Sequence, residues 1–243
     1  MAVKADSKNG ATVWLDSEYP WKVYDAMGDG VRKYSLQPGF PCDNTTGDPT
    51  QFAMTVVEAG AGNTTVVNGT DIGYPMLITT DAAEYDGVNL QLKGEQAKLA
   101  SGQTVNLRGV FKLSEDTQND FLFGLAETKT DLLKHETAHG ITATNVEGAF
   151  FYKADGAKTI KFKVYKDGSE VFTVDCGDAT KEDQEYAIDF DGAKITIYLD
   201  NVKIAEFAGT LPNGELTPSI NLRAGSAAAN TCAVKVLDFV AIG

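Results

Sequence analysis

From about residue 52 onward, apolar and polar residues alternate with a period of two. The stretches that show or continue this pattern are 52–57, 76–79, 88–93, 159–166, 194–199 and 202–207. Successive side chains of a β-strand point to opposite faces, so the alternation predicts antiparallel strands with one face in a core and one in water. In the stretch 159–166 this sends Ile160, Phe162 and Val164 inward, and Lys161 and Lys163 outward.

Residue pairs that favour tight turns separate these stretches. They are Asp155-Gly156, Asp167-Gly168, Asp191-Gly192 and Asp200-Asn201. Many short strands joined by such turns, with almost no helical periodicity, predict an all-β fold, an antiparallel β-sandwich of the jelly-roll kind. The one weak helical stretch, 130–139, has few apolar positions and ends at Gly140, so we expect a loop there.

Residues 1–50 differ from the rest of the chain. They contain both tryptophans, Trp14 and Trp21, and four of the prolines, without sustained alternation. A proline-punctuated segment that carries two large aromatic side chains is expected to dock on a partner. We therefore predict an extended N-terminal arm over residues 1–50 and a sandwich domain over 51–243. The alternative is that the arm packs back on its own sandwich.

Charge and composition exclude several classes of protein. Lys and Arg number 21 against 34 Asp and Glu, a formal net charge of −13, which disfavours binding to nucleic acid. No stretch approaches the roughly 18 to 20 apolar residues that span a bilayer, and the N-terminus lacks the apolar run of a signal peptide. We expect the chain to fold in a reducing cytoplasm, with Cys42, Cys176 and Cys232 as free thiols.

The stretch His135-Glu136-Thr137-Ala138-His139 matches the HExxH motif of zinc proteases. That chemistry needs a firm helix, a third metal ligand and an open coordination position. The helix is weak, no third histidine exists, and the acids that would have to substitute, Glu147 and Glu170, lie in or beside hairpins. We expect neither catalysis nor a resident metal at this stretch. Adventitious metal binding is the weaker alternative.

Other catalytic patterns are absent from the sequence. It contains no ExDxxE of laminarinase-type β-sandwich glycosidases, no GxSxG and no glycine-rich phosphate loop. Acidic residues recur in the expected turns, at Asp155, Asp167, Asp178 and Asp191, and calcium binding is an alternative to a plain turn there. We expect a protein without cofactor and without enzymatic activity.

Three consecutive aromatic residues, Phe150, Phe151 and Tyr152, cannot all face one core. At least one must point away from it, toward a neighbouring subunit, the arm or a sugar. We take Phe150 and Tyr152, together with Trp14 and Trp21, as candidates for contact with a partner protein or a second subunit.

The hairpin over residues 185–204 resembles those of concanavalin A-like and laminin G-like jelly rolls. The segments 121–128, 148–153, 211–219 and 225–240 resemble structural proteins encoded beside the capsid genes of tailed bacteriophages, especially marine ones. This resemblance implies a non-enzymatic virion protein that decorates or cements the capsid. It would bind the major capsid protein as a homo-oligomer, a trimer or a dimer, on the capsid surface after synthesis in the host cytoplasm.

The alternative is a glycan- or receptor-binding module of a head fibre or tail, with a surface glycan as partner. The chain departs from sugar-binding lectins because their metal-and-sugar loops are not recognisable in it.

Overall fold

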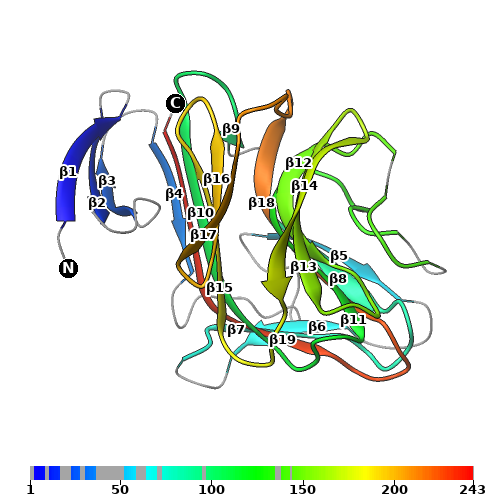
Figure 1. Cartoon of the computed structure of the whole chain (residues 1–243). Helices are drawn as coiled ribbons and strands as arrows, with labels where there is room; N and C mark the ends of the chain where they lie inside the picture. The colour runs from blue at the N-terminus through cyan, green and yellow to red at the C-terminus, as the bar shows by residue number, and fades with distance from the viewer. Residues whose placement is uncertain are drawn as a thin grey trace.

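The computed structural model describes residues 3–8, 11–16, 23–27, 31–36, 52–58, 64–69, 73–94, 97–134, 138–142 and 144–242, with side chains from Tyr34 onward. Two antiparallel sheets pack face to face as a sandwich (Figure 1). The described residues contain no helix, and therefore none that is long and apolar enough to cross a membrane. The predicted all-β sandwich is confirmed.

One sheet, called the β10 sheet here, has the order β17-β16-β15-β10-β19-β7-β6, with β4 pairing with β19. Its strands are β4 (Val31–Ser35), β6 (Thr65–Asn68), β7 (Met76–Thr79), β10 (Thr104–Leu113), β15 (Gln184–Phe190), β16 (Ile195–Leu199), β17 (Val202–Phe207) and β19 (Thr231–Ile242).

The other sheet, called the β11 sheet, has the order β14-β13-β12-β11-β18-β8-β5, with β9 pairing with β18. Its strands are β5 (Phe52–Val57), β8 (Gly87–Leu92), β9 (Ala97–Lys98), β11 (Asn119–Ala126), β12 (Gly148–Lys153), β13 (Thr159–Lys166), β14 (Ser169–Asp178) and β18 (Glu215–Ala224).

The N-terminal segment is not a strand-free arm. A third, three-stranded sheet forms from β1 (Val3–Lys8), β2 (Ala11–Asp16) and β3 (Val23–Met27), which Figure 1 shows in blue beside β4. Strand β4 belongs to the sandwich itself, because it pairs with the C-terminal half of β19. The predicted boundary at residue 50 thus leaves one sandwich strand on the arm side. Alternation missed these strands because their sequences mix charged, aromatic and small residues without a regular apolar face.

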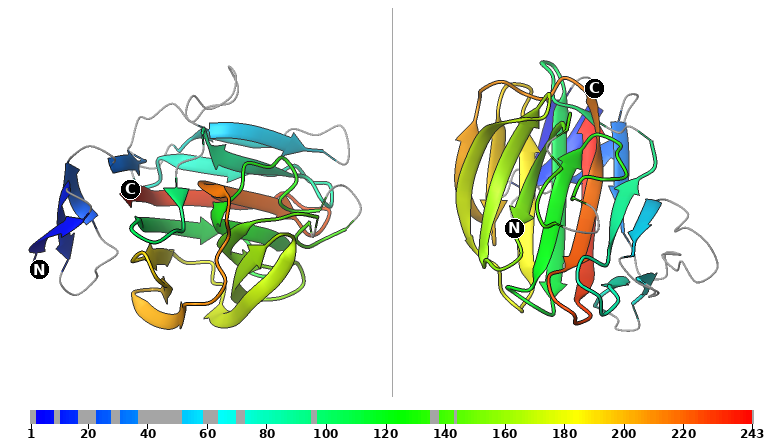
Figure 2. Two further views of the ribbon diagram at one scale, coloured as in Figure 1. Left: turned by 90° about the horizontal axis from the view of Figure 1, so that it is seen from above. Right: turned by 90° about the vertical axis from the view of Figure 1, so that its right-hand side faces the viewer.

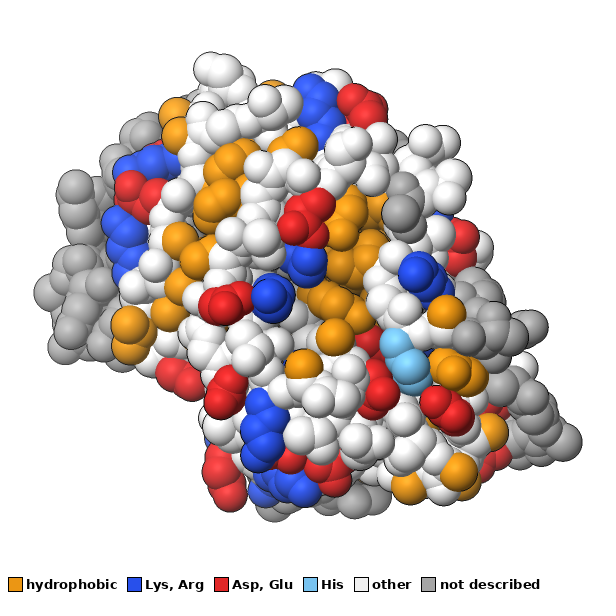
Figure 3. Space-filling view, turned by 45° about the vertical axis from the view of Figure 1, so that its right-hand side comes forward, with side chains coloured by type: hydrophobic (Ala, Val, Ile, Leu, Met, Phe, Trp, Pro, Cys, Tyr) orange, Lys and Arg blue, Asp and Glu red, His pale blue; other side chains and the backbone are white. Residues whose placement is uncertain are grey.

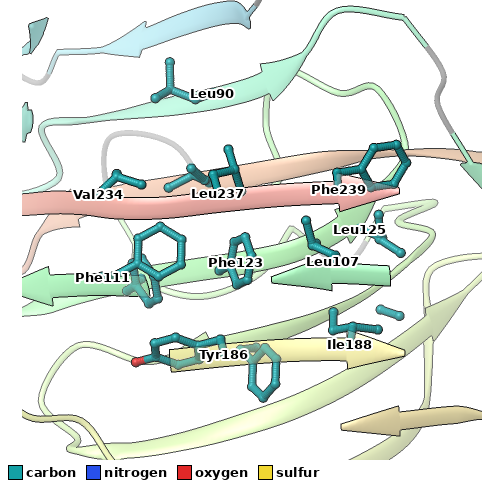
Figure 4. Close-up of a cluster of buried hydrophobic side chains, with 14 of the residues drawn as sticks. Leu90, Leu107, Phe111, Phe123, Leu125, Tyr186, Ile188, Val234, Leu237 and Phe239 are labelled. Atoms are coloured by element: carbon teal, nitrogen blue, oxygen red, sulfur yellow. The ribbon is translucent and has the colours of Figure 1, made fainter. Parts of the chain in front are cut away.

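The core lies between the two sheets and is rich in aromatic rings (Figure 4). Tyr186 stands at its centre, with the rings of Phe111, Phe121, Phe123 and Phe151 between 5.2 and 6.2 Å away, centroid to centroid. The core positions expected on β13 are fully buried, whereas the side chains of the intervening lysines reach solvent. The predicted alternation on this strand is confirmed.

The expected turn chemistry is also confirmed. Both central residues of the β13–β14 and β16–β17 hairpins have positive φ, at 50° and 75° for Asp167 and Gly168 and at 50° and 65° for Asp200 and Asn201. This is the backbone that a two-residue type I′ hairpin requires. The Asp191 side chain accepts hydrogen bonds from the N–H groups of Ala193 and Lys194, which accounts for that turn without calcium.

The outer face of the β11 sheet is covered by the chain itself over β8, β11 and β12. The connection from β11 to β12, described at residues 127–134, 138–142 and 144–147 and called the cover segment here, lies outside this sheet, on the right of Figure 1. Its Leu132, Leu133 and Val146 are at most 1% exposed and pack on outward side chains of β11 and β12. The segment therefore builds a second, smaller core on the face that alternation assigned to water.

Strand β8 shows the consequence. Its polar residues Asn89 and Gln91 were expected in water, but both are 4% exposed. The Gln91 side chain donates to the carbonyl of Glu127 (2.8 Å) and accepts from the N–H of Lys129 (2.8 Å). The Asn89 amide donates to the carbonyl of Lys129 (2.6 Å). The prediction of a solvated face on β8 was wrong, because these side chains anchor the cover segment.

Candidate functional site

A polar cluster forms where the cover segment meets the end of the β11 sheet. It contains Asp120 from the start of β11, Tyr152 from the end of β12, Asp155 from the β12–β13 turn, Glu84 and Tyr85 from the β7–β8 loop, and His139 from the cover segment. We call it the His139 cluster. Figure 2 (right) looks toward this side of the molecule, and Figure 3 shows a histidine among acidic side chains at its surface.

Asp120 is the buried centre of the cluster. It is 0% exposed, and its Oδ2 lies 2.6 Å from Nδ1 of His139. Its Oδ1 accepts hydrogen bonds from the hydroxyl of Tyr152 (2.6 Å) and the N–H of Asp155 (3.1 Å). A carboxylate only accepts, so Nδ1 of His139 carries the proton in this contact. Three segments distant in sequence are thus joined through one carboxylate.

The other side of His139 faces the molecular surface. Its Nε2 lies 3.5 Å from Oε1 of Glu84 and 3.6 Å from Oδ2 of Asp155. The Tyr85 ring lies against the imidazole, with centroids 4.7 Å apart and planes at 38°. The Glu84 side chain is 49% exposed and that of His139 is 23% exposed. The rim therefore offers carboxylate oxygens and an aromatic ring to a ligand from solvent.

The backbone of Tyr85 is strained. Its φ is 75°, in the left-handed region that bulky non-glycine residues rarely adopt. The Tyr85 N–H donates to the carbonyl of Ala224 (2.9 Å), and the Asp86 N–H donates to the carbonyl of Ala83 (3.2 Å), which closes the turn. A glycine or an asparagine would adopt this φ at a lower conformational free energy. The presence of a tyrosine at this position therefore indicates a role for its ring.

Burial sets the electrostatics of the cluster. It raises the pKa of Asp155, against the opposing effect of His139. Burial and the Asp120 carboxylate raise the pKa of the Tyr152 phenol, which keeps its proton and donates it to Asp120. The nearby Lys153 ammonium is 0% exposed, and burial lowers its pKa to about 8. Because its protons are directed at four backbone carbonyls, Lys153 presents no cation to a ligand at the rim.

Two of the four predicted contact residues are covered by the chain itself. Phe150 is 0% and Tyr152 6% exposed. Phe151 belongs to the main core and the other two rings to the smaller core, so the predicted division between faces is correct. The expectation that Phe150 and Tyr152 are open to a partner needs correction, because the cover segment occupies that space. For Trp14 only the backbone in β2 is described, and Trp21 lies outside the described residues, so contact by these two stays a prediction.

The HExxH stretch contributes one residue to the cluster. His135 lies outside the described residues, and His139 binds Asp120 from a loop. Neither acid considered as a third zinc ligand is free for that role. Glu147 accepts from the N–H groups of Asn213 (2.9 Å) and Gly214 (2.6 Å), and Glu170 pairs with Lys163. The loop that we expected in place of a helix is what the described residues of the stretch adopt.

A separate acidic group lies at the end of β5. Oxygen atoms of Glu58, Asp81 and Asp86 all lie within 4.8 Å of one another, the one such group of possible metal ligands in the described part of the chain. Glu58 also accepts from the N–H of Thr64 (2.7 Å). Acidic side chains often gather without an ion, so this group is not by itself a metal site.

Sequence reasoning missed half of the His139 cluster. It noted His139 for a zinc motif, Asp155 for a turn and Tyr152 for contact with a partner, whereas Glu84 and Tyr85 carried no signal. One indication was present: Asp120 directly precedes the apolar run Phe121–Ala126, where a carboxylate at a strand start needs partners.

The fold is similar to that of several solved structures. The carbohydrate recognition domain of Emp47p matches with a TM-score of 0.57 and 13% identity, over 85% of this chain and 94% of that one. A GH16 protein of the Bacteroides ovatus mixed-linkage glucan locus matches with a TM-score of 0.58 and 14% identity, over 85% and 99%. SO2946 from Shewanella oneidensis MR-1, a protein of unknown function, has a TM-score of 0.58 at 10% identity, over 90% and 89%.

At these identities the likeness shows the fold alone, a β-sandwich of the jelly-roll kind. This agrees with the resemblance drawn from the hairpin at residues 185–204. No family model and no curated protein sequence matches the chain. The comparisons give no support to the phage origin or the capsid role.

Proposed function

We propose that this chain is a carbohydrate-binding protein without catalytic activity, and that its ligand docks on the rim of the His139 cluster. The observation that carries the proposal is Tyr85, an aromatic residue held at a φ of 75° with its ring against His139. Backbone strain of this kind costs on the order of 1–3 kcal/mol and gathers at ligand sites.

The chemistry of the rim suits sugar hydroxyls. Glu84 and Asp155 supply carboxylate oxygens beside Nε2 of His139, and each oxygen accepts a hydrogen bond from a hydroxyl. The Tyr85 ring supplies an apolar face with a polar tip, the combination that amphipathic ligands contact. Asp120 binds the buried Nδ1 side of the His139 ring, and the backbone hydrogen bonds of the turn fix Tyr85. The site is therefore organised before a ligand arrives.

The structural neighbours favour the same class of ligand. The Emp46p and Emp47p structures are described as carbohydrate recognition domains, and others as a glycosidic hydrolase, a GH16 protein and a lichenase. Because one fold supports many functions, this likeness alone does not identify the ligand. The residues of the His139 cluster supply the more specific support for a glycan.

Catalysis of the glycosidase type is disfavoured by the outer face of the β11 sheet. Glycosidases place two carboxyl groups about 5 to 9.5 Å apart across the scissile bond. On β11 and β12 the outward positions include Leu122, Ala126 and Phe150, all buried beneath the cover segment. Asp120 is the carboxylate on that face of β11, and it is bound to His139 and Tyr152. No second carboxylate faces an open cleft on these two strands.

The capsid-decorating role stays a prediction from segment resemblance, as do the homo-oligomer and the virion location. The buried state of Phe150 and Tyr152 removes two of the four residues on which contact was predicted. Glycan binding, the alternative drawn from the sequence, is the better supported of the two.

Glycan-array binding and a reducing-sugar assay on β-glucans test the proposal together. Wild type is expected to bind a subset of glycans and to release no reducing ends. Glu84→Gln and Tyr85→Asn should each weaken binding by about tenfold, since each removes a rim group. Asparagine tolerates positive φ, so the second variant tests the ring without adding strain. Glu215→Gln, an exposed change at the start of β18, is the matched control.

Absence of binding to every glycan, or equal binding by all variants, would contradict the proposed site. Release of reducing ends by wild type but not by Asp120→Asn would show a hydrolase.

A further inference from the structure

The outer face of the β10 sheet contains a hollow of about 310 Å³, separate from the His139 cluster. Its floor is made by Val110 of β10 and Val236 of β19, which are register partners and point away from the main core. The hairpin turn at Asp200 and Asn201 bounds one end. This volume falls at the lower end of the 300–1,000 Å³ that small-molecule sites occupy.

A β-bulge shapes the hollow. Val110 pairs with Val236 and Phe111 with Val234, so Lys235 is an extra residue on β19. A bulge turns its side chains away from strict alternation, and here Lys235 and Val236 both line the hollow. Bulges are kept where they aim a side chain, which makes this irregularity a second sign of a site.

Two ion pairs form the walls. Arg108 donates from Nε and Nη2 to the two carboxylate oxygens of Glu185, both at 2.9 Å. Opposite, Lys235 Nζ lies 2.6 Å from Oδ2 of Asp183, whose Oδ1 accepts from the hydroxyl of Tyr74 (2.5 Å). Each cation of the hollow thus already has a carboxylate partner.

Paired walls disfavour an anionic ligand. Such a ligand has to displace a carboxylate from its cation, which is costly when the group is partly buried, and it also meets the further carboxylate of Asp200. A hydroxyl donates and accepts at once, so it can bridge a guanidinium and a carboxylate that remain paired. The valine floor suits the C–H face of a sugar ring.

We propose that this hollow is a second saccharide site, for a neutral rather than an anionic sugar ring. The inference rests on the proposed function for its ligand class, and it adds a site on the opposite sheet from the His139 cluster. Two sites on opposite faces let one chain bridge two glycan strands, or bind a branched surface with avidity.

Amide chemical shifts of the full chain, followed during titration, test both sites at once. The probes are the methyl glycosides of glucose, galactose, mannose and fucose, and cellotetraose. At least one neutral probe should shift the amides of Val110, Lys235, Val236 and Asn201. Glucuronate, the anionic counterpart of glucose, should bind the hollow at least about fivefold more weakly. Tighter binding of glucuronate would overturn the preference for a neutral ring.

Val236→Tyr fills the hollow and should weaken binding there by about tenfold or more, whereas Val56→Tyr, an exposed position on β5 of the other sheet, is the matched control. Lys235→Ala changes an exposed residue, keeps folding secure, and should weaken binding about fivefold. Unchanged binding in Lys235→Ala would overturn the site.

The pattern of shifts separates the two proposals. Shifts at the hollow alone support the second site and refute the His139 cluster as a glycan site. Shifts at Glu84, Tyr85 and His139 alone refute the second site and leave the proposed function intact. No shift with any probe refutes both.

Discussion

Replacement of Lys153 by methionine should change how the stability of the protein depends on pH. Lys153 lies at the end of β12 and is 0% exposed. Its Nζ donates to the carbonyl oxygens of Asn119 (2.6 Å), Thr117 (3.2 Å), Ala157 (3.2 Å) and Ala154 (3.3 Å). Burial lowers its pKa to about 8, although the carboxylates of Asp120 and Asp155 oppose the shift.

The sign of the effect follows from proton binding in the two states. An unfolded lysine has a pKa of about 10.4, so between pH 8 and 10.4 the unfolded chain binds more protons at this residue than the folded chain. The free energy of unfolding that this group contributes therefore rises with pH across that window. The difference between a pKa of about 8 in the folded chain and about 10.4 in the unfolded chain corresponds to about 3 kcal/mol, gained by pH 10.4 and absent below pH 8.

Urea denaturation of wild type and Lys153→Met at several pH values between 7 and 10.5 measures this term. Other groups titrate in the same range with the opposite sign, since burial raises the pKa of Cys176 to about 12. They are common to both proteins and cancel in the difference. We expect wild type minus variant to rise by about 3 kcal/mol from pH 7 to 10.5. A difference that stays flat within about 0.5 kcal/mol would show that folding does not lower the pKa of Lys153.

Three further changes test the fold. Phe162→Ala should lower the free energy of unfolding by about 2–5 kcal/mol through lost burial and a cavity, whereas Lys161→Ala on the same strand should lower it by under about 0.5 kcal/mol. Urea denaturation measures both, and equal losses would contradict the predicted alternation. Gln91→Leu leaves two backbone groups of the cover segment without their hydrogen-bond partner and should lower the free energy of unfolding by about 2 kcal/mol or more. Amide hydrogen exchange in residues 127–134 should accelerate, and unchanged exchange there would contradict the anchoring. Gly124→Ala places a Cβ 2.4 Å from the Cα of Phe150 and should cost about 1–3 kcal/mol in thermal melts; a neutral result would mean that the two strands separate easily.

The hairpins were predictable because their determinants are local. Each combines a turn pair with positive φ and two flanking alternating stretches, and β13, β16 and β17 came out within one residue of expectation. Strand pairing within a hairpin then follows from the turn itself, since the register is fixed at the reversal. The sandwich class follows in turn from how many such hairpins the chain contains.

Contacts between distant segments were not predictable in this way. The alternation around Asn89 and Gln91 predicted a solvated face. These side chains are buried because they bind backbone groups about forty positions later in the sequence. Strand β4 pairs with β19 at the other end of the chain, so its short sequence carried no local sign of the sandwich. In both cases the deciding residues are far apart in the sequence, and a period-two pattern contains no information about such distant partners.

The candidate site shows the same division. His139 was noticed for its spacing from His135, yet its partners Asp120, Glu84 and Asp155 come from three other segments. Tyr85 gave no signal, because the sequence around it does not favour positive φ at an aromatic residue. A constellation assembled by tertiary structure is visible only once the segments have been brought together.

The cover segment explains why recognition is expected at the end of the β11 sheet and not across its face. An open sheet face binds an extended chain along its strands, but here Leu132, Leu133 and Val146 fill that face and polar side chains of β8 fix the segment in place. Beside the covered strands the border of the segment is accessible, where His139 meets Glu84, Tyr85 and Asp155. A site confined to this border fits a terminal or branching sugar better than an internal stretch of a long polysaccharide. Shortened oligosaccharides should therefore bind as tightly as their parent polymers, and affinity that grows steadily with chain length would show that the ligand crosses the sheet face after all.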